Sequence, residues 1–70
     1  MTVTNITSSN IQTVEYNENI NTLIVEFKSG AKYAYSNVPK GVFDRMITAS
    51  SVGSYLNENI RNRYTYIRLS

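Results

Sequence analysis

The feature that most restricts the fold is a predicted hairpin in residues 22–36, TLIVEFKSGAKYAYS, in which apolar and polar residues alternate on both sides of a KSG turn. A two-residue loop would set Tyr33 opposite Glu26 and mix the core face with the solvent face. A three-residue loop pairs Tyr33 with Val25 and keeps the two faces apart. That loop is a type I turn plus a bulge, and it requires a left-handed residue last, where Gly30 stands. The sequence therefore predicts an antiparallel hairpin with this register.

The segments that flank the hairpin extend it into an α+β fold. TVEY (13–16) alternates as a strand does, and the turn-rich NENIN segment joins it to the hairpin. We expect an antiparallel three-stranded meander packed by two short helices on one face, with YTYIRL (64–69) as a candidate C-terminal edge strand. The prediction is one domain over residues 1–70, with its core at about 9–69.

Two helices are predicted after the sheet. Pro39 suits a first helical turn, and the helix that follows should end near Ala49. Its apolar stripe consists of Val42, Phe43, Met46 and Ile47. Ser50 or Ser51 can cap a second helix that runs toward residue 61. The apolar residues that this helix would bury are Leu56 and Ile60.

The chain has 70 residues and contains neither cysteine nor histidine. Small domains often need disulfides, metal ions or subunit contacts, because burial barely offsets an ordering cost of roughly 1.5 kcal/mol per residue. Disulfides and soft metal sites lack their ligands here, so we expect a homo-oligomer, no metal site and no cofactor. The usual nucleophile–base pairs are missing as well, and the five acidic residues are scattered. We therefore expect no catalytic residues and no enzymatic activity.

The distribution of charge favours a phosphate-bearing partner. Residues 1–39 carry two lysines against three glutamates, whereas residues 40–70 carry five cations against two acids. Such asymmetry suits a nucleotide or nucleic acid, although a slightly basic solvated surface explains it as well. No run approaches the roughly 20 apolar residues of a membrane span, and no secretory signal is visible. We expect a cytoplasmic protein that does not contact membranes.

A helical wheel places Gly53, Asn57 and Arg61 in a stripe on the shoulder of the second helix, beside its buried face. Glycine permits close approach to the backbone, asparagine both donates and accepts, and the arginine fork suits phosphate. N–H groups near Ser51 could add affinity for anions. The structural alternative is that Gly53 clears the first helix, Asn57 caps a loop and Arg61 pairs with Glu58.

Tyrosines form a second set of candidates, because aromatic side chains on a sheet can stack on the bases of single-stranded nucleic acids. Tyr33 faces Val25 and is expected in the core, whereas Tyr35 lies nearer the strand end and is expected to keep its hydroxyl at the rim. The predicted ligand-binding residues are Ser51, Gly53, Asn57, Arg61, Tyr64, Tyr35 and Arg63.

The order of several of these residues resembles the KTSC domain family, from about Ser9 to Leu69. The central Tyr33-Ala34-Tyr35 is similar to the family's YxY signature. The later positions that match are Val38, Pro39, Ala49, Ser51, Gly53, Tyr55, Asn57, Ile60, Arg61 and Tyr64. The family occurs as small bacterial and phage proteins and at the C-terminus of some lysyl-tRNA synthetases. The resemblance implies a domain for which RNA binding has been suggested, and its matched positions coincide with the stripe.

Three functions follow as hypotheses. The first is a non-enzymatic pocket for a small phosphate-bearing nucleotide, which an oligomer of this chain could use to sequester a nucleotide signal. The second is a single-stranded RNA or DNA-binding module that uses Arg61, Arg63, Arg68 and exposed tyrosines. The third is a protein-interaction module or inhibitor whose basic tail binds an acidic partner. The net charge of +2 favours the small ligand, because a long phosphate footprint needs more cations on one face.

Overall fold

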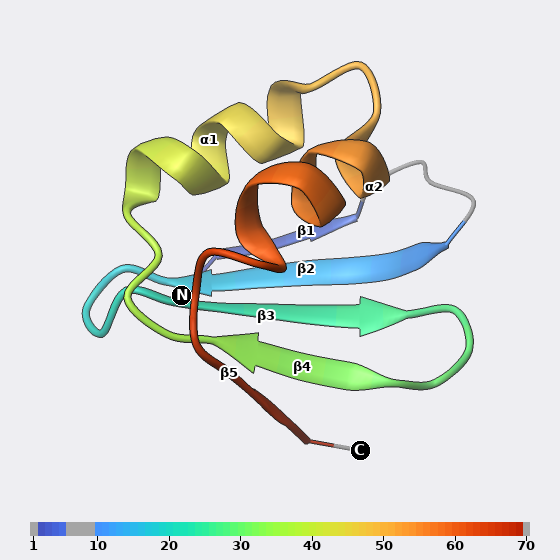
Figure 1. Ribbon diagram of the computed structural model, residues 1–70, viewed down its shortest axis with the longest axis horizontal. Helices are drawn as coiled ribbons and strands as arrows, with labels where there is room; N and C mark the ends of the chain where they lie inside the picture. Colours follow the sequence, from blue (N-terminus) through green and yellow to red (C-terminus); the bar gives the residue numbers. More distant parts are fainter. Residues whose placement is uncertain (1, 6–9, 70) are drawn as a thin grey trace.

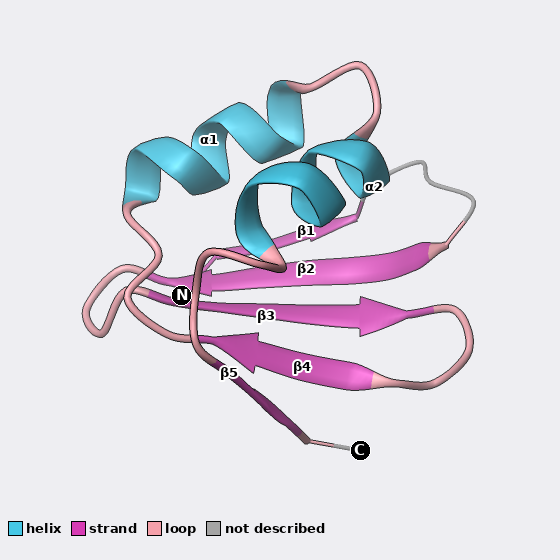
Figure 2. Cartoon of the chain, viewed as in Figure 1, coloured by secondary structure: helices cyan, strands magenta, loops and turns pink. Residues whose placement is uncertain are grey.

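A five-stranded antiparallel sheet carries two helices on one of its faces (Figures 1 and 2). The computed structural model describes residues 2–5 and 10–69. The strands lie in sequence order and are β1 (Thr2–Asn5), β2 (Ile11–Asn17), β3 (Thr22–Phe27), β4 (Lys32–Tyr35) and β5 (Tyr66–Arg68). The helices are α1 (Lys40–Thr48) and α2 (Val52–Tyr55), and α2 continues into a π-helical turn, η1 (Leu56–Ile60).

The predicted α+β class is confirmed, and the three-stranded meander is present as β2, β3 and β4. The candidate edge strand of the tail is also present, because β5 pairs with β4 and sets Ile67 opposite Ala34. The prediction missed β1, which pairs with β2 and sets Val3 opposite Glu15. Four residues give too short an alternation to indicate a strand, so β1 is defined by the partner strand beside it.

The hairpin between β3 and β4 has the predicted three-residue loop. Val25 lies opposite Tyr33, and the Phe27 N–H donates to the carbonyl of Ala31 over 2.8 Å. Gly30 closes the loop at φ +98°, in the left-handed region where a Cβ causes strain. The backbone demand for glycine at this one position therefore sets the register of the whole hairpin.

A buried aromatic stack fixes α1 on the sheet. The ring of Tyr16, from β2, lies 4.8 Å from that of Phe43, from α1, at 12° between the planes. The Tyr16 hydroxyl donates to the buried carbonyl of Val38 over 2.6 Å, immediately before the N-cap Pro39. The predicted start of α1 is confirmed, and the helix ends with Ala49 as its C-cap, as expected. None of the helices in the described ranges is long and apolar enough to cross a membrane.

The second helix changes its geometry halfway along. Ser51 is the N-cap, and its hydroxyl oxygen accepts the Ser54 N–H over 3.3 Å, which confirms one of the two predicted caps. The Arg61 N–H then donates to the carbonyl of Leu56, five residues earlier, over 2.8 Å. The helix reaches the predicted length, but its last part is a π turn that the sequence pattern did not indicate. Leu56 and Ile60 are buried as expected.

Two glycines give a matched test of the hairpin. Gly30→Ala should lower the free energy of unfolding by about 1–2 kcal/mol, because alanine is strained at positive φ although no atom lies within 4 Å of the new Cβ. Gly41→Ala, in α1 and equally uncrowded, should raise it by about 0.5–1 kcal/mol, because alanine favours the helix. Urea unfolding measures both. Equal effects of the two substitutions would show that Gly30 does not fix the turn.

Candidate functional site

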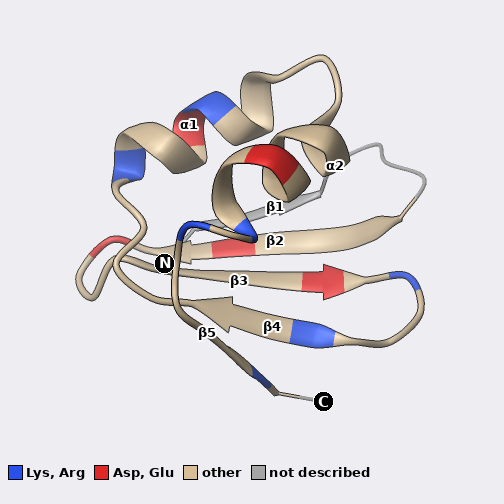
Figure 3. Cartoon of the chain, viewed as in Figure 1, with Lys and Arg blue, Asp and Glu red and all other residues tan. Residues whose placement is uncertain are grey.

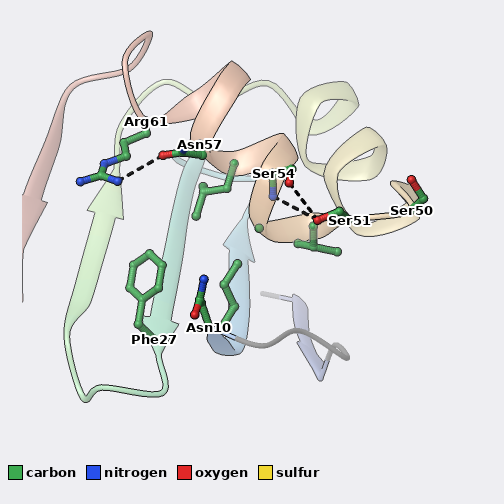
Figure 4. Close-up of a pocket in the computed structure, with 11 residues that line it drawn as sticks. Asn10, Phe27, Ser50, Ser51, Ser54, Asn57 and Arg61 are labelled. Atoms are coloured by element: carbon green, nitrogen blue, oxygen red, sulfur yellow. Dashed lines mark hydrogen bonds between the residues drawn. The ribbon is translucent and has the colours of Figure 1, made fainter.

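A cavity of about 560 Å³ lies between the start of α2 and the adjoining ends of β2 and β3 (Figure 4). Its polar lining residues are Asn10, Ser50, Ser51, Ser54, Asn57 and Arg61. Its remaining lining residues are Ile11, Phe27, Val52, Gly53 and Leu56. Figure 4 shows Phe27 and Asn10 across the cavity from the helix, with Arg61 and Asn57 near one end and the serines near the other. The cavity therefore has one charged end and one end rich in hydroxyl groups.

Arg61 supplies the charge of this cavity. It is the only charged residue among the described residues that line the cavity, and its Nη1 donates to Oδ1 of Asn57 over 3.1 Å. The expected alternative, an ion pair with Glu58, is not formed; in the described part of the chain the only salt bridge joins Lys40 to Asp44 at 3.2 Å. Figure 3 colours the basic residues blue and the acidic residues red along the chain. Arg61 is thus oriented by a neutral partner, and its charge is not neutralised by a described carboxylate.

The serine end is already hydrogen-bonded within itself. The Ser51 hydroxyl donates to the Ser54 hydroxyl over 3.1 Å, and the Ser54 N–H donates to the Ser51 oxygen. The Ser54 N–H is therefore engaged by the cap, so it does not supply the anion affinity expected of the helix start. Gly53 lies in the cavity wall with a negative φ, so its backbone conformation does not require glycine.

The π turn keeps the predicted stripe together. In an α-helix, residues four apart drift by about 40° around the axis, so Arg61 would turn away from Gly53. A π turn contains more residues than an α turn. The angle around the helix axis between Asn57 and Arg61 is therefore smaller than in an α-helix. The Asn59 side-chain amide donates to the carbonyl of Tyr55 over 3.3 Å, which gives that carbonyl a side-chain donor within the widened turn. The local sequence thus supports the geometry that places Arg61 beside Asn57.

A smaller groove of about 230 Å³ adjoins the cavity and shares Phe27 and Arg61 with it. The aromatic groove, as we call it, is lined by Phe27, Tyr33, Tyr35 and Tyr66, together with Ser29, Ala31 and Arg61. The ring of Tyr33 lies 5.7 Å from that of Phe27 and 5.5 Å from that of Tyr66, nearly perpendicular to both. Tyr33, expected in the core, is only half-buried and forms part of this wall.

Tyr35 lies at the base of the aromatic groove. Its side chain is 2 % exposed, and burial raises the pKa of its hydroxyl, whereas the nearby charge of Arg61 lowers that pKa. Every fully buried side-chain nitrogen or oxygen atom of the described residues has a hydrogen-bond partner. The Tyr35 hydroxyl has no partner among the described residues, so its oxygen is not fully buried. The oxygen therefore reaches the groove surface, in agreement with the rim position expected from the sequence.

The structure brings together Ser51, Gly53, Asn57 and Arg61, four of the seven predicted residues, and places Tyr35 in the adjoining groove. The other two do not join them: Tyr64 is half-buried against the core, and Arg63 is exposed; both lie outside the two cavities. The lining residues that the sequence did not indicate include Asn10, Phe27 and Ser54. Only Phe27 had a usable signal, because it belongs to the apolar face of its strand next to the turn.

Metal binding has no support in the described residues, which contain no cluster of three or more histidine, cysteine, aspartate or glutamate side chains. The described cavities offer hydrogen-bonding groups, one positive charge and aromatic rings. The arrangement suits an anion with a polar body and an adjoining flat ring.

Comparison with known proteins identifies relatives over nearly the whole chain. A family model described as the KTSC domain matches residues 7–64. A protein of Tsukamurella paurometabola is 33 % identical over 64 residues, which cover 91 % of this chain and 96 % of the relative. A lysine–tRNA ligase of Nostoc punctiforme is 34 % identical over 60 residues, which cover 86 % of this chain but only 11 % of the ligase. The chain thus spans about a ninth of that ligase.

A solved structure has the same fold. The crystal structure of a KTSC domain protein from Yersinia pestis matches with a TM-score of 0.92, covering 99 % of this chain and 97 % of that chain. The sequence identity is 20 %, so the likeness concerns the fold alone.

The position of Arg61 can be tested through Tyr35. Arg61→Ala should raise the pKa of the Tyr35 hydroxyl, because it removes a positive charge that stabilises the phenolate. Arg45→Ala is the matched control: Arg45 is an exposed arginine of α1 outside both cavities, and its loss should leave this pKa unchanged. NMR titration of tyrosine ring carbons measures the pKa in each variant. An unchanged or lowered Tyr35 pKa in Arg61→Ala would contradict the site geometry.

Proposed function

The chain belongs to the KTSC domain family, and we propose that it is a non-enzymatic protein that binds a small phosphate-bearing nucleotide. The observation that carries the proposal is the guanidinium of Arg61, held at 3.1 Å by Asn57 and not neutralised by a described carboxylate. A phosphate is the partner that a planar, partly available arginine fork suits best. Ser51 and Gly53 line the same wall of the cavity.

The size of the cavity supports a small ligand over a polymer. A volume of about 560 Å³ falls within the roughly 300–1,000 Å³ of typical small-molecule sites. One arginine in the lining matches one or two phosphates, whereas a nucleic acid site that contacts six to ten phosphates needs a row of cations. The proposed ligand is therefore a mononucleotide or dinucleotide.

Sequestration is the function that fits a protein that binds a nucleotide and does not convert it. The described lining of the cavity offers no histidine, cysteine or carboxylate, so a bound nucleotide would be released unchanged. We propose that the chain acts in the cytoplasm as a homo-oligomer that removes a nucleotide signal from circulation. Self-association would also supply stabilisation that a 70-residue core lacks.

Single-stranded RNA binding is the second candidate, and a specific arrangement favours it. The guanidinium carbon of Arg68 lies 5.8 Å from the ring centre of Tyr33, next to the half-exposed ring of Tyr66. Aromatic rings with a neighbouring arginine are the usual elements of sequence-tolerant strand binding. The lysine–tRNA ligase relative, by its name, acts on an RNA, and this gives the second candidate its associational support.

Binding of the four 5′-mononucleotides AMP, GMP, CMP and UMP tests the first proposal. The tightest of them should lose about 10- to 100-fold in affinity on Arg61→Ala, because a charge-assisted hydrogen bond contributes roughly 1.5–3 kcal/mol. Arg45→Ala should bind as the parent does. NMR titration measures the affinities, and native mass spectrometry checks that folding and subunit number are unchanged.

The outcomes separate the three hypotheses. A folded Arg61→Ala variant that binds nucleotides as tightly as the parent would refute the proposal. Tight binding of oligo-U with a steep salt dependence, lost when Arg68 or Tyr66 is replaced, would favour the strand-binding module. Binding of neither probe, together with specific retention of an acidic protein, would favour an interaction module or inhibitor.

A further inference from the structure

The aromatic groove is the feature that the phosphate site does not use. We propose that this groove binds the planar base of the same nucleotide whose phosphate lies against Arg61. The inference rests on the proposed function and deepens it, because it assigns the two chemically different halves of the ligand to two adjoining cavities. The ligand class becomes a nucleotide held by both its phosphate and its base.

The two cavities adjoin at Arg61 and Phe27, which line both. Asn57 holds Nη1 of Arg61 on the cavity side, while the arginine charge acts on the hydroxyl of Tyr35 on the groove side. Arg61 is therefore the partition between the two spaces. A ligand that extends from the cavity past Arg61 into the groove contacts the guanidinium with its phosphate. The rest of that ligand contacts the tyrosines.

The two volumes suit different parts of a nucleotide. The groove, at about 230 Å³, is smaller than the roughly 300–1,000 Å³ that holds a complete small ligand, whereas the cavity, at about 560 Å³, lies inside that range. A volume of 230 Å³ equals the space of several water molecules at about 30 Å³ each, which is enough for one planar ring system. The groove therefore accommodates the base and leaves the sugar and phosphate to the cavity.

The groove offers both a ring surface and polar edges. Tyr66 is 50 % exposed, so part of its ring is accessible to a base at the outer wall. None of the hydroxyl hydrogen bonds between described residues involves Tyr33, Tyr35 or Tyr66. Each hydroxyl can both donate and accept, as recognition of a base edge requires.

The experiment compares a nucleotide with its fragment that lacks the base. The full chain is titrated with AMP, GMP, CMP and UMP and with ribose 5-phosphate, and NMR follows the tyrosine ring signals. The tightest nucleotide should bind more strongly than ribose 5-phosphate and should shift the ring signals of Tyr66. Tyr66→Ala should weaken that nucleotide by about 5- to 150-fold and leave ribose 5-phosphate unchanged, because one base stacking contact is lost. Tyr66→Phe keeps the ring and should retain most of the affinity.

Three results would overturn the inference. If Tyr66→Ala binds the nucleotide as the parent does, the groove does not hold the base, and the phosphate site stands as long as Arg61→Ala still weakens binding. If ribose 5-phosphate and the nucleotides bind equally to the parent, the base makes no contact. If none of the probes binds, both the inference and the proposed function fail. The ring shifts in the parent need no substitution, so they decide the point even if Tyr66→Ala does not fold.

Discussion

The candidate site depends on one backbone hydrogen bond, from the Arg61 N–H to the carbonyl of Leu56 over 2.8 Å. This bond closes a π turn in place of a last α turn. Leu56 and Ile60 of this turn are buried, and Arg61 lies beside Asn57. Such turns are rare and occur often at functional sites, because they alter the direction of side chains without ending the helix. Arg61, which directly follows this turn, lines both cavities.

The sheet supplies the other half of the site through its register. A three-residue loop ending in Gly30 sets Val25 opposite Tyr33 and Leu23 opposite Tyr35. β5 then places Tyr66 opposite Tyr35, and the ring of Tyr66 lies 5.5 Å from the rings of both Tyr33 and Tyr35. Figure 1 shows β4 and β5 next to each other at the edge of the sheet. A slip of one residue would move Tyr33 and Tyr35 to the opposite face. The groove is therefore a consequence of the hairpin, as the cavity is a consequence of the helix.

Much of this organisation was predictable from the sequence, for identifiable reasons. Alternation and the glycine turn determine β3 and β4, and the stripe of Gly53, Asn57 and Arg61 follows from helical spacing. The π turn was not predictable, because the periodicity of LNENI fits an α-helix equally well.

The tertiary parts of the site were also not predictable from local pattern. Asn10 reaches the cavity only because β2 begins beside β3. Tyr64 was a candidate because it matches the family pattern, and Arg63 because it belongs to the arginine-rich end of the chain, but both lie beyond the π turn and outside both cavities. The local sequence pattern thus does not indicate which side chains are brought together by strand pairing or by a change in helical geometry.

Native mass spectrometry shows whether Arg61 holds a phosphate-bearing nucleotide. The full chain and its Arg61→Ala variant are each incubated with the small-molecule fraction of a bacterial cell extract and measured without denaturation. We expect the parent to retain an added mass identified as a phosphate-bearing nucleotide, and the variant, with the same subunit number, to lack it. If the parent retains no such mass, or if the variant retains the same nucleotide, Arg61 does not hold a phosphate-bearing nucleotide.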